Sequence, residues 1–208
     1  MNNLVKHLFD NNFDEILQRS LLNCHVKGLH SIMLSEHKGA TIRLYVADTN
    51  HELYVNNEFD ILTHDLSIAF HPHHCNLTLE CVKGQFLNWE VKESDKGIKL
   101  NKFLYHSAII EGKTHFELID ENSHIETLKN RFVNKGECVM MKAEELHTVA
   151  VEKGKVAAWL VYEGKEDEKY SSYCWSNADL TNQDFSGLYG KPTKEDIFSL
   201  LKIAGFEV

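Results

Sequence analysis

Three histidines stand within four positions in the segment Phe70-His-Pro-His-His-Cys, just before an apolar run that is typical of a β-strand. Imidazole is a common metal ligand, and two histidines separated by one residue reach the same side of an extended chain. His71 and His73 are therefore candidates for two neighbouring ligands of one divalent ion. Pro72 between them removes a backbone donor, which suits the end of a strand better than its middle.

Strand alternation predicts which of these side chains point inward. If the chain is extended from His71 onward, His71 and His73 share a face with the apolar side chains of the following strand, so they face the interior. His74 and Glu80 fall on the opposite face. A slip of one residue would exchange His73 for His74, and a bulge would be needed to turn Glu80 inward.

A third nitrogen ligand is predicted much later in the chain. Gly136 opens a strand, residues 142–145 form a turn, and His147 begins the next strand. Val149 and Val151 share the parity of His147, so its imidazole is expected to face the core as well. A histidine at an inward position of an apolar strand completes a possible set of three ligands.

The rest of the chain supplies the elements that must position these histidines. Residues 1–29 contain apolar side chains at helical spacing, and residues 30–165 are a series of short alternating runs separated by turns. Residues 166–208 are expected to form a polar arm and a helix, which begins near Thr193 and ends at Gly205. We therefore predict a single domain, dominated by an antiparallel β-sandwich or barrel, with helices packed outside it.

Composition excludes several classes of partner. The formal net charge of −9 over 208 residues argues against nucleic acid, which needs a basic face. The apolar runs are too short to span a bilayer and the start has no signal pattern, so we expect a cytoplasmic protein without a membrane partner. Five cysteines without a CxxC pair do not indicate a disulfide framework.

The order of these anchors resembles the two-motif signature of the cupin superfamily. The resemblance covers roughly residues 65–163 and is carried by His71 and His73, the glycine turn at Gly84, and the later His147. It implies a jelly-roll barrel, the double-stranded β-helix of cupins, that holds a divalent metal through histidines of both motifs. His71, His73 and His147 are the metal ligands that this resemblance implies.

Two departures from the cupin pattern narrow the resemblance. The position of the usual family glutamate is occupied by Leu77, and the proline and glycine that usually precede the late histidine are missing. A three-histidine set without the glutamate is similar to the thiol dioxygenase branch, whose members hold Fe(II). That similarity implies that Arg43 pairs with a substrate carboxylate and that Tyr162 donates a hydrogen bond in catalysis.

Three functions remain open from the sequence. The first is a metal-dependent oxygenase of a small molecule, which could be a thiol, with Fe(II) as the first choice of metal. The second is an isomerase, lyase or hydrolase that uses Zn, Mn or Ni on the same barrel, because fold alone does not select a chemistry. The third is a small-ligand binding protein without catalysis. Strand-rich edges and an aromatic arm favour a homodimer in each case.

Overall fold

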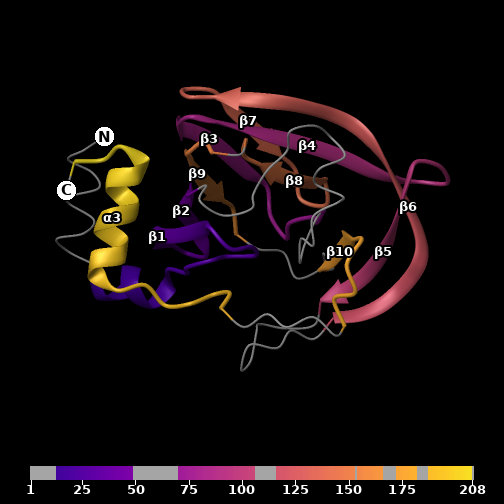
Figure 1. Cartoon of the computed structure of the whole chain (residues 1–208), viewed down its shortest axis with the longest axis horizontal. Coiled ribbons are helices and arrows are strands. Elements are labelled where there is room, and N and C mark those ends of the chain that lie inside the picture. The colour runs from indigo at the N-terminus through magenta and orange to yellow at the C-terminus, as the bar shows by residue number, and fades with distance from the viewer. Residues whose placement is uncertain are drawn as a thin grey trace.

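The computed structural model describes residues 13–48, 70–105, 116–152, 154–165, 172–181 and 187–207. Within them the strands form two five-stranded antiparallel sheets (Figure 1). The first sheet has the order β1 (Leu29–His37), β2 (Ala40–Ala47), β9 (Ala157–Glu163), β3 (Leu77–Lys83) and β7 (Cys138–Met141). The second has the order β10 (Tyr173–Ser176), β5 (Ile98–Tyr105), β6 (Phe116–Asn134), β4 (Gln85–Ser94) and β8 (Leu146–Ala150).

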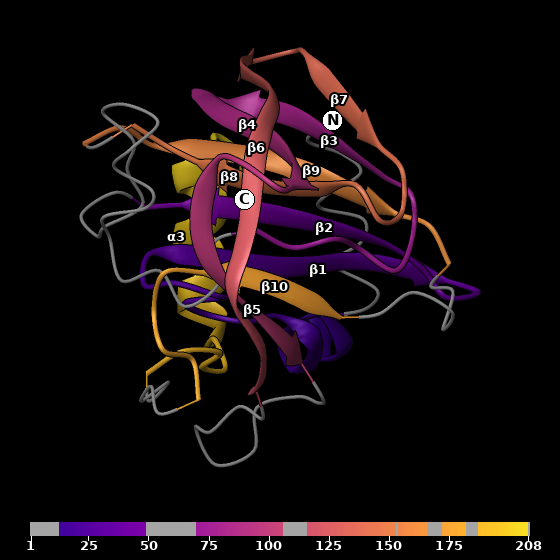
Figure 2. The same ribbon diagram turned by 90° about the vertical axis from the view of Figure 1, so that its right-hand side faces the viewer.

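The chain passes from the first sheet to the second at Gly84, between β3 and β4. Gly84 has a φ of +67°, and a Cβ built there would lie 2.2 Å from the carbonyl oxygen of Val156. Only glycine meets both conditions, because other residues disfavour this backbone region and would collide with the neighbouring strand. This corner lets two consecutive strands belong to different sheets, which face each other in Figure 2.

The main core lies between the two sheets. Phe86 from β4 packs on Trp159 from β9, with ring centroids 5.1 Å apart, and Leu79 and Val161 are buried in the same cluster. Odd-numbered residues of β3 and β9 point into this space, because successive side chains of a strand alternate between its faces. The alternation predicted from the sequence therefore describes the first sheet correctly.

The other face of the first sheet is covered by α3 (Lys194–Ala204), as Figure 1 shows. Thr193 caps the helix through a reciprocal pair of hydrogen bonds with Asp196, and Gly205 ends it in the left-handed conformation. Ile197 and Leu201 pack in one cluster with apolar side chains of β2, and residues 13–19 form a further helical turn beside them. Both helices were predicted, and both lie outside the barrel.

Residues 70 and 71 link the two edge strands of the second sheet. Phe70 exchanges backbone hydrogen bonds with Trp175 of β10, and His71 does the same with His147 of β8. These bridges pair both edges of the sheet and close it into a ring, which is filled by a cluster that includes Phe70 and Trp89. The chain direction at His71 is therefore fixed by the same strand that carries His147.

The predicted jelly-roll barrel is confirmed, with two differences in detail. The segment 72–76 is irregular, whereas a strand was predicted from His71 onward, because Pro72 cannot donate to a ladder. The arm predicted from residue 166 contributes β10, a strand too short to be recognised by alternation. Parts of the predicted strand-rich region, residues 49–69 and 106–115, lie outside the described residues. No described helix has the length and apolarity needed to cross a bilayer.

Candidate metal centre

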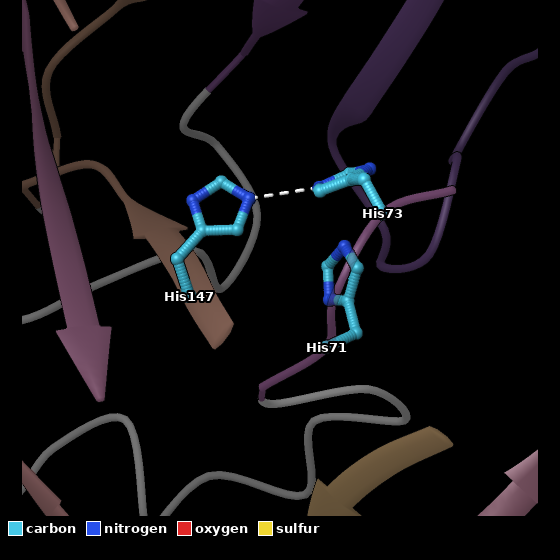
Figure 3. A group of neighbouring side chains, drawn as sticks. All are labelled: His71, His73 and His147. Carbon is cyan, nitrogen blue, oxygen red and sulfur yellow. Dashed lines mark hydrogen bonds between the residues drawn. The ribbon is translucent and has the colours of Figure 1, made fainter. Parts of the chain in front are cut away.

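Three imidazoles converge at the end of the barrel where β8 meets the segment before β3. His71 and His73 come from that irregular segment, and His147 is the second residue of β8. One ring nitrogen from each lies within 4.8 Å of the other two, and Nε2 of His73 is 2.9 Å from Nε2 of His147. Figure 3 shows the three rings turned toward a common space.

These separations suit nitrogen ligands of one ion. A histidine nitrogen lies about 2.1 Å from a divalent transition metal, so two ligands at a right angle stand about 3.0 Å apart. The pair formed by His73 and His147 already has this separation. His71 Nδ1 is buried without a hydrogen-bond partner among the described residues, so a small rotation of this ring breaks no bond there.

Electrostatics keep the three imidazoles neutral, as metal ligands must be. Burial lowers the pKa of His147 to about 3, with a smaller contribution from His71. The pKa values of His71 and His73 also lie well below the ordinary range, first because of burial and then because of the neighbouring imidazoles. Each ring therefore offers a lone pair at neutral pH rather than a positive charge.

The proton of His147 is assigned by its partner on β4. Nδ1 of His147 lies 2.8 Å from Oδ1 of Asn88, whose side chain is fully buried. An amide oxygen can only accept a hydrogen bond, so Nδ1 carries the proton and Nε2 carries the lone pair, which accepts from Nε2 of His73 at 2.9 Å. That lone pair points toward His73 and the space shared by the three rings.

A cavity of about 90 Å³ opens beside the three histidines, between the facing sheets. Most of its wall is aliphatic and aromatic, and Tyr45 stacks on Trp159 with ring planes 8° apart. His25 is a fourth imidazole of this wall, held by a 2.9 Å hydrogen bond between its Nδ1 and the hydroxyl of Tyr189. A space of this size admits a small ligand and a few waters.

Arg43 lies on the inward face of β2 but does not line the cavity. Its guanidinium Nε is 3.5 Å from a carboxylate oxygen of Glu163, and its Nη1 donates to the hydroxyl of Ser31. Glu163 itself lines the cavity and also accepts from Thr41. The predicted pairing of Arg43 with a substrate carboxylate therefore has a competitor, because an internal carboxylate already occupies that guanidinium.

Tyr162 lies on the outer face of β9, where it is 37% exposed and donates a 2.9 Å hydrogen bond to Glu80. Burial and the Glu80 carboxylate raise its pKa to about 12. This placement does not support the predicted catalytic role, because strand alternation turns Tyr162 away from the cavity that Val161 lines. His74 is likewise outside the cluster, with Nε2 2.8 Å from the hydroxyl of Ser172.

Two residues of the site were not predicted from the sequence. His25 sits in a turn with a φ of +71°, far from any motif, and no local pattern points to it. Asn88 does carry a signal, because it is a polar residue within the apolar run from Phe86 to Trp89. A buried amide needs a hydrogen-bond partner, so such a position indicates a specific contact even when the partner is unknown.

No protein-family model matches the chain, and no curated protein matches it. Among solved structures, hydroxypropylphosphonic acid epoxidase from S. wedmorenis is 12% identical, with a TM-score of 0.41 over 71% of this chain and 56% of that one. Fe(II) HppE is 14% identical, with a TM-score of 0.38 over 67% and 51%. A conserved protein of unknown function from Streptococcus pyogenes is 13% identical, with a TM-score of 0.34 over 67% and 76%. The chain thus spans about half the length of the epoxidase structures, and at these TM-scores none of the likenesses bears on its activity.

Proposed function

We propose that the protein is a mononuclear metalloenzyme that oxygenates a small molecule, with His71, His73 and His147 as the metal ligands. The observation that carries this proposal is the convergence of three neutral imidazoles at the wall of a small cavity. Three neutral ligands leave the charge of a divalent ion uncompensated and leave further coordination positions open. Fe(II) at such a site would supply redox chemistry with O₂.

The residues around the cavity have separate roles in this proposal. Trp159 and the aliphatic wall exclude water and bury the apolar part of the substrate. His25, fixed by Tyr189, orients a polar group of the substrate by hydrogen bonding. Its imidazole is neutral at pH 7, because burial and the nearby Arg43 lower its pKa to about 4.

Metal content tests the ligand set. Protein purified without oxygen should contain about one iron per chain, and His71→Ala and His147→Ala should each retain less than about a tenth of it, since a two-ligand site binds weakly. His74→Ala is the matched control, because it removes a neighbouring imidazole that bonds Ser172 instead. Unchanged metal in both ligand variants would favour a binding protein without catalysis.

Oxygen uptake tests the reaction class. The iron-loaded protein should consume O₂ with at least one member of a panel of small molecules that includes thiols, and His147→Ala should abolish that uptake. Full occupancy by zinc without oxygen uptake would favour an isomerase, lyase or hydrolase instead. The thiol substrate, the homodimer and the cytoplasmic location stay predictions from the sequence.

A further inference from the structure

A chain of side-chain hydrogen bonds leads from His147 along one face of the second sheet to Glu90. Asn88 accepts from Nδ1 of His147 at 2.8 Å, and its own Nδ2 donates to Oε1 of Glu90 at 2.9 Å. Asn88 and Glu90 are two residues apart on β4, and Glu90 is directly opposite His147 in the ladder with β8. The three side chains therefore share one face of the sheet.

Glu90 determines which way the Asn88 amide points. If the amide were reversed, its oxygen would face the Glu90 carboxylate and its NH₂ would face the protonated Nδ1 of His147. The amide oxygen and the carboxylate would then be two opposed acceptors, and Nδ1 could accept from the NH₂ only if the proton of His147 moved to Nε2. The carboxylate thus holds the amide in the one orientation that presents an acceptor to His147.

The burial of the three groups differs in a way that favours this arrangement. Asn88 is fully buried and His147 is 3% exposed, so an unpaired donor or acceptor on either would be costly. Glu90 lines a separate open groove of about 530 Å³, together with Lys102 and Trp175. The groove leaves Glu90 accessible to water, and the buried amide of Asn88 links it to His147.

We infer that Asn88 and Glu90 are positioning residues that fix the tautomer and ring orientation of His147 and thereby set the metal affinity of the three-histidine site. The inference rests on the proposed function, because it takes Nε2 of His147 to be the atom that binds the metal. Partners behind a ligating histidine are worth about 10- to 100-fold in metal affinity. Neither residue needs to touch the metal or the substrate.

The inference is tested by measuring Fe(II) affinity in one variant that should lose it and in a second variant that should keep it. Asn88→Leu should weaken Fe(II) binding by about 10- to 100-fold, because Nδ1 of His147 loses its acceptor. In the double variant Asn88→Asp/Glu90→Gln, the side chain at position 90 donates the hydrogen bond and the side chain at position 88 accepts it. Position 88 still presents an acceptor to His147, so the Fe(II) affinity should stay within about threefold of wild type. Glu93→Gln is the control on the same strand, since Glu93 is exposed and its carboxylate pairs with Lys102.

The tautomer can be measured without any metal. Long-range ¹H–¹⁵N NMR spectra of the metal-free wild type should show His147 protonated at Nδ1, and Glu90→Gln should lower that population because its amide no longer dictates the orientation of Asn88. This readout also keeps the test decisive if Asn88→Leu does not fold.

The outcomes separate this inference from the proposed function. Wild-type affinity in folded Asn88→Leu, or a double variant that binds metal no better than Asn88→Leu, would overturn the inference. The same holds for an unchanged tautomer in Glu90→Gln. If the wild type binds no metal while its NMR spectrum shows the predicted tautomer, the proposed function fails and the role of Asn88 in setting the tautomer stands.

Discussion

Val161 and Tyr162 are neighbours on β9 and have opposite surroundings. Val161 lines the cavity beside the three histidines, whereas Tyr162 reaches the exposed carboxylate of Glu80. Alternation along β9 turns Tyr162 away from the interior, whereas His71 and His73 reach it from the irregular segment before β3. At the scale of single residues, the face of a strand decides which side chains can take part in the chemistry.

Tyr162→Phe is expected to leave the site unchanged. The substitution removes one exposed hydrogen bond to Glu80, so the free energy of unfolding should change by no more than about 0.5 kcal/mol. Metal affinity and oxygen uptake should equal those of the wild type, as measured by titration and with an oxygen electrode. A tenfold loss of uptake with normal metal content would restore the catalytic role predicted from the sequence.

The three clustered histidines could be predicted from sequence because they occupy patterned positions, whereas their neighbours in the fold could not. His71 and His73 are recognised by their spacing, and His147 is recognised by its position in an apolar strand. His25 lines the cavity because of where its turn lies in the fold. Glu163 pairs with Arg43 because β2 and β9 are adjacent strands. Contacts between distant strands depend on the sheet order, which alternation along one strand does not reveal.

At the scale of elements, the tight turn at Gly84 positions the strands that form the site. Gly84 turns the chain from β3 into β4, and these two strands carry the inward apolar wall and Asn88 respectively. Gly136 has a similarly positive φ of +88°, but a Cβ there would meet nothing within 4 Å. Both glycines carry the cost of the left-handed backbone conformation, whereas a steric overlap would arise only at Gly84. Comparing the two positions therefore separates these two costs.

Gly84→Ala should destabilise the protein much more than Gly136→Ala. Alanine in the left-handed region costs about 1–2 kcal/mol at either position. At Gly84 the new methyl group would also overlap Val156, which must shift as part of the chain that leads into β9. We expect a loss of about 1 kcal/mol for Gly136→Ala and about 3 kcal/mol or more for Gly84→Ala, measured by urea denaturation. Equal losses would show that β9 adapts to the methyl group without cost.

The elements themselves were predicted unevenly, for a physical reason. Long alternating runs such as β4 and β5, and the capped helix α3, carry their own local signals. β10 is four residues long, and the bridges at Phe70 and His71 involve single residues, so their positions are decided by partners distant in sequence. The closure of the second sheet was therefore not visible in the sequence, although it fixes the backbone at His71.

At the scale of the whole molecule, the buried histidines couple stability to pH. Burial lowers the pKa of His147 to about 3 and that of His25 to about 4, and the pKa values of His71 and His73 are lowered as well. In the unfolded chain these imidazoles take up protons below about pH 6.5. Between that pH and the folded pKa values, the unfolded state binds more protons, so stability must fall as the pH falls.

We expect the metal-free protein to lose stability steeply between about pH 6.5 and 4, by roughly 1 kcal/mol per pH unit for each fully neutral histidine. Urea denaturation at several pH values measures this slope. His25→Asn should reduce the slope by about one proton, and asparagine tolerates the positive φ at this position. His37→Gln is the matched control, because His37 is exposed and lies outside the buried cluster of histidines. Stability that stays constant from pH 7 to 5 would mean that these imidazoles accept protons in the folded state, which is incompatible with a neutral three-histidine ligand set.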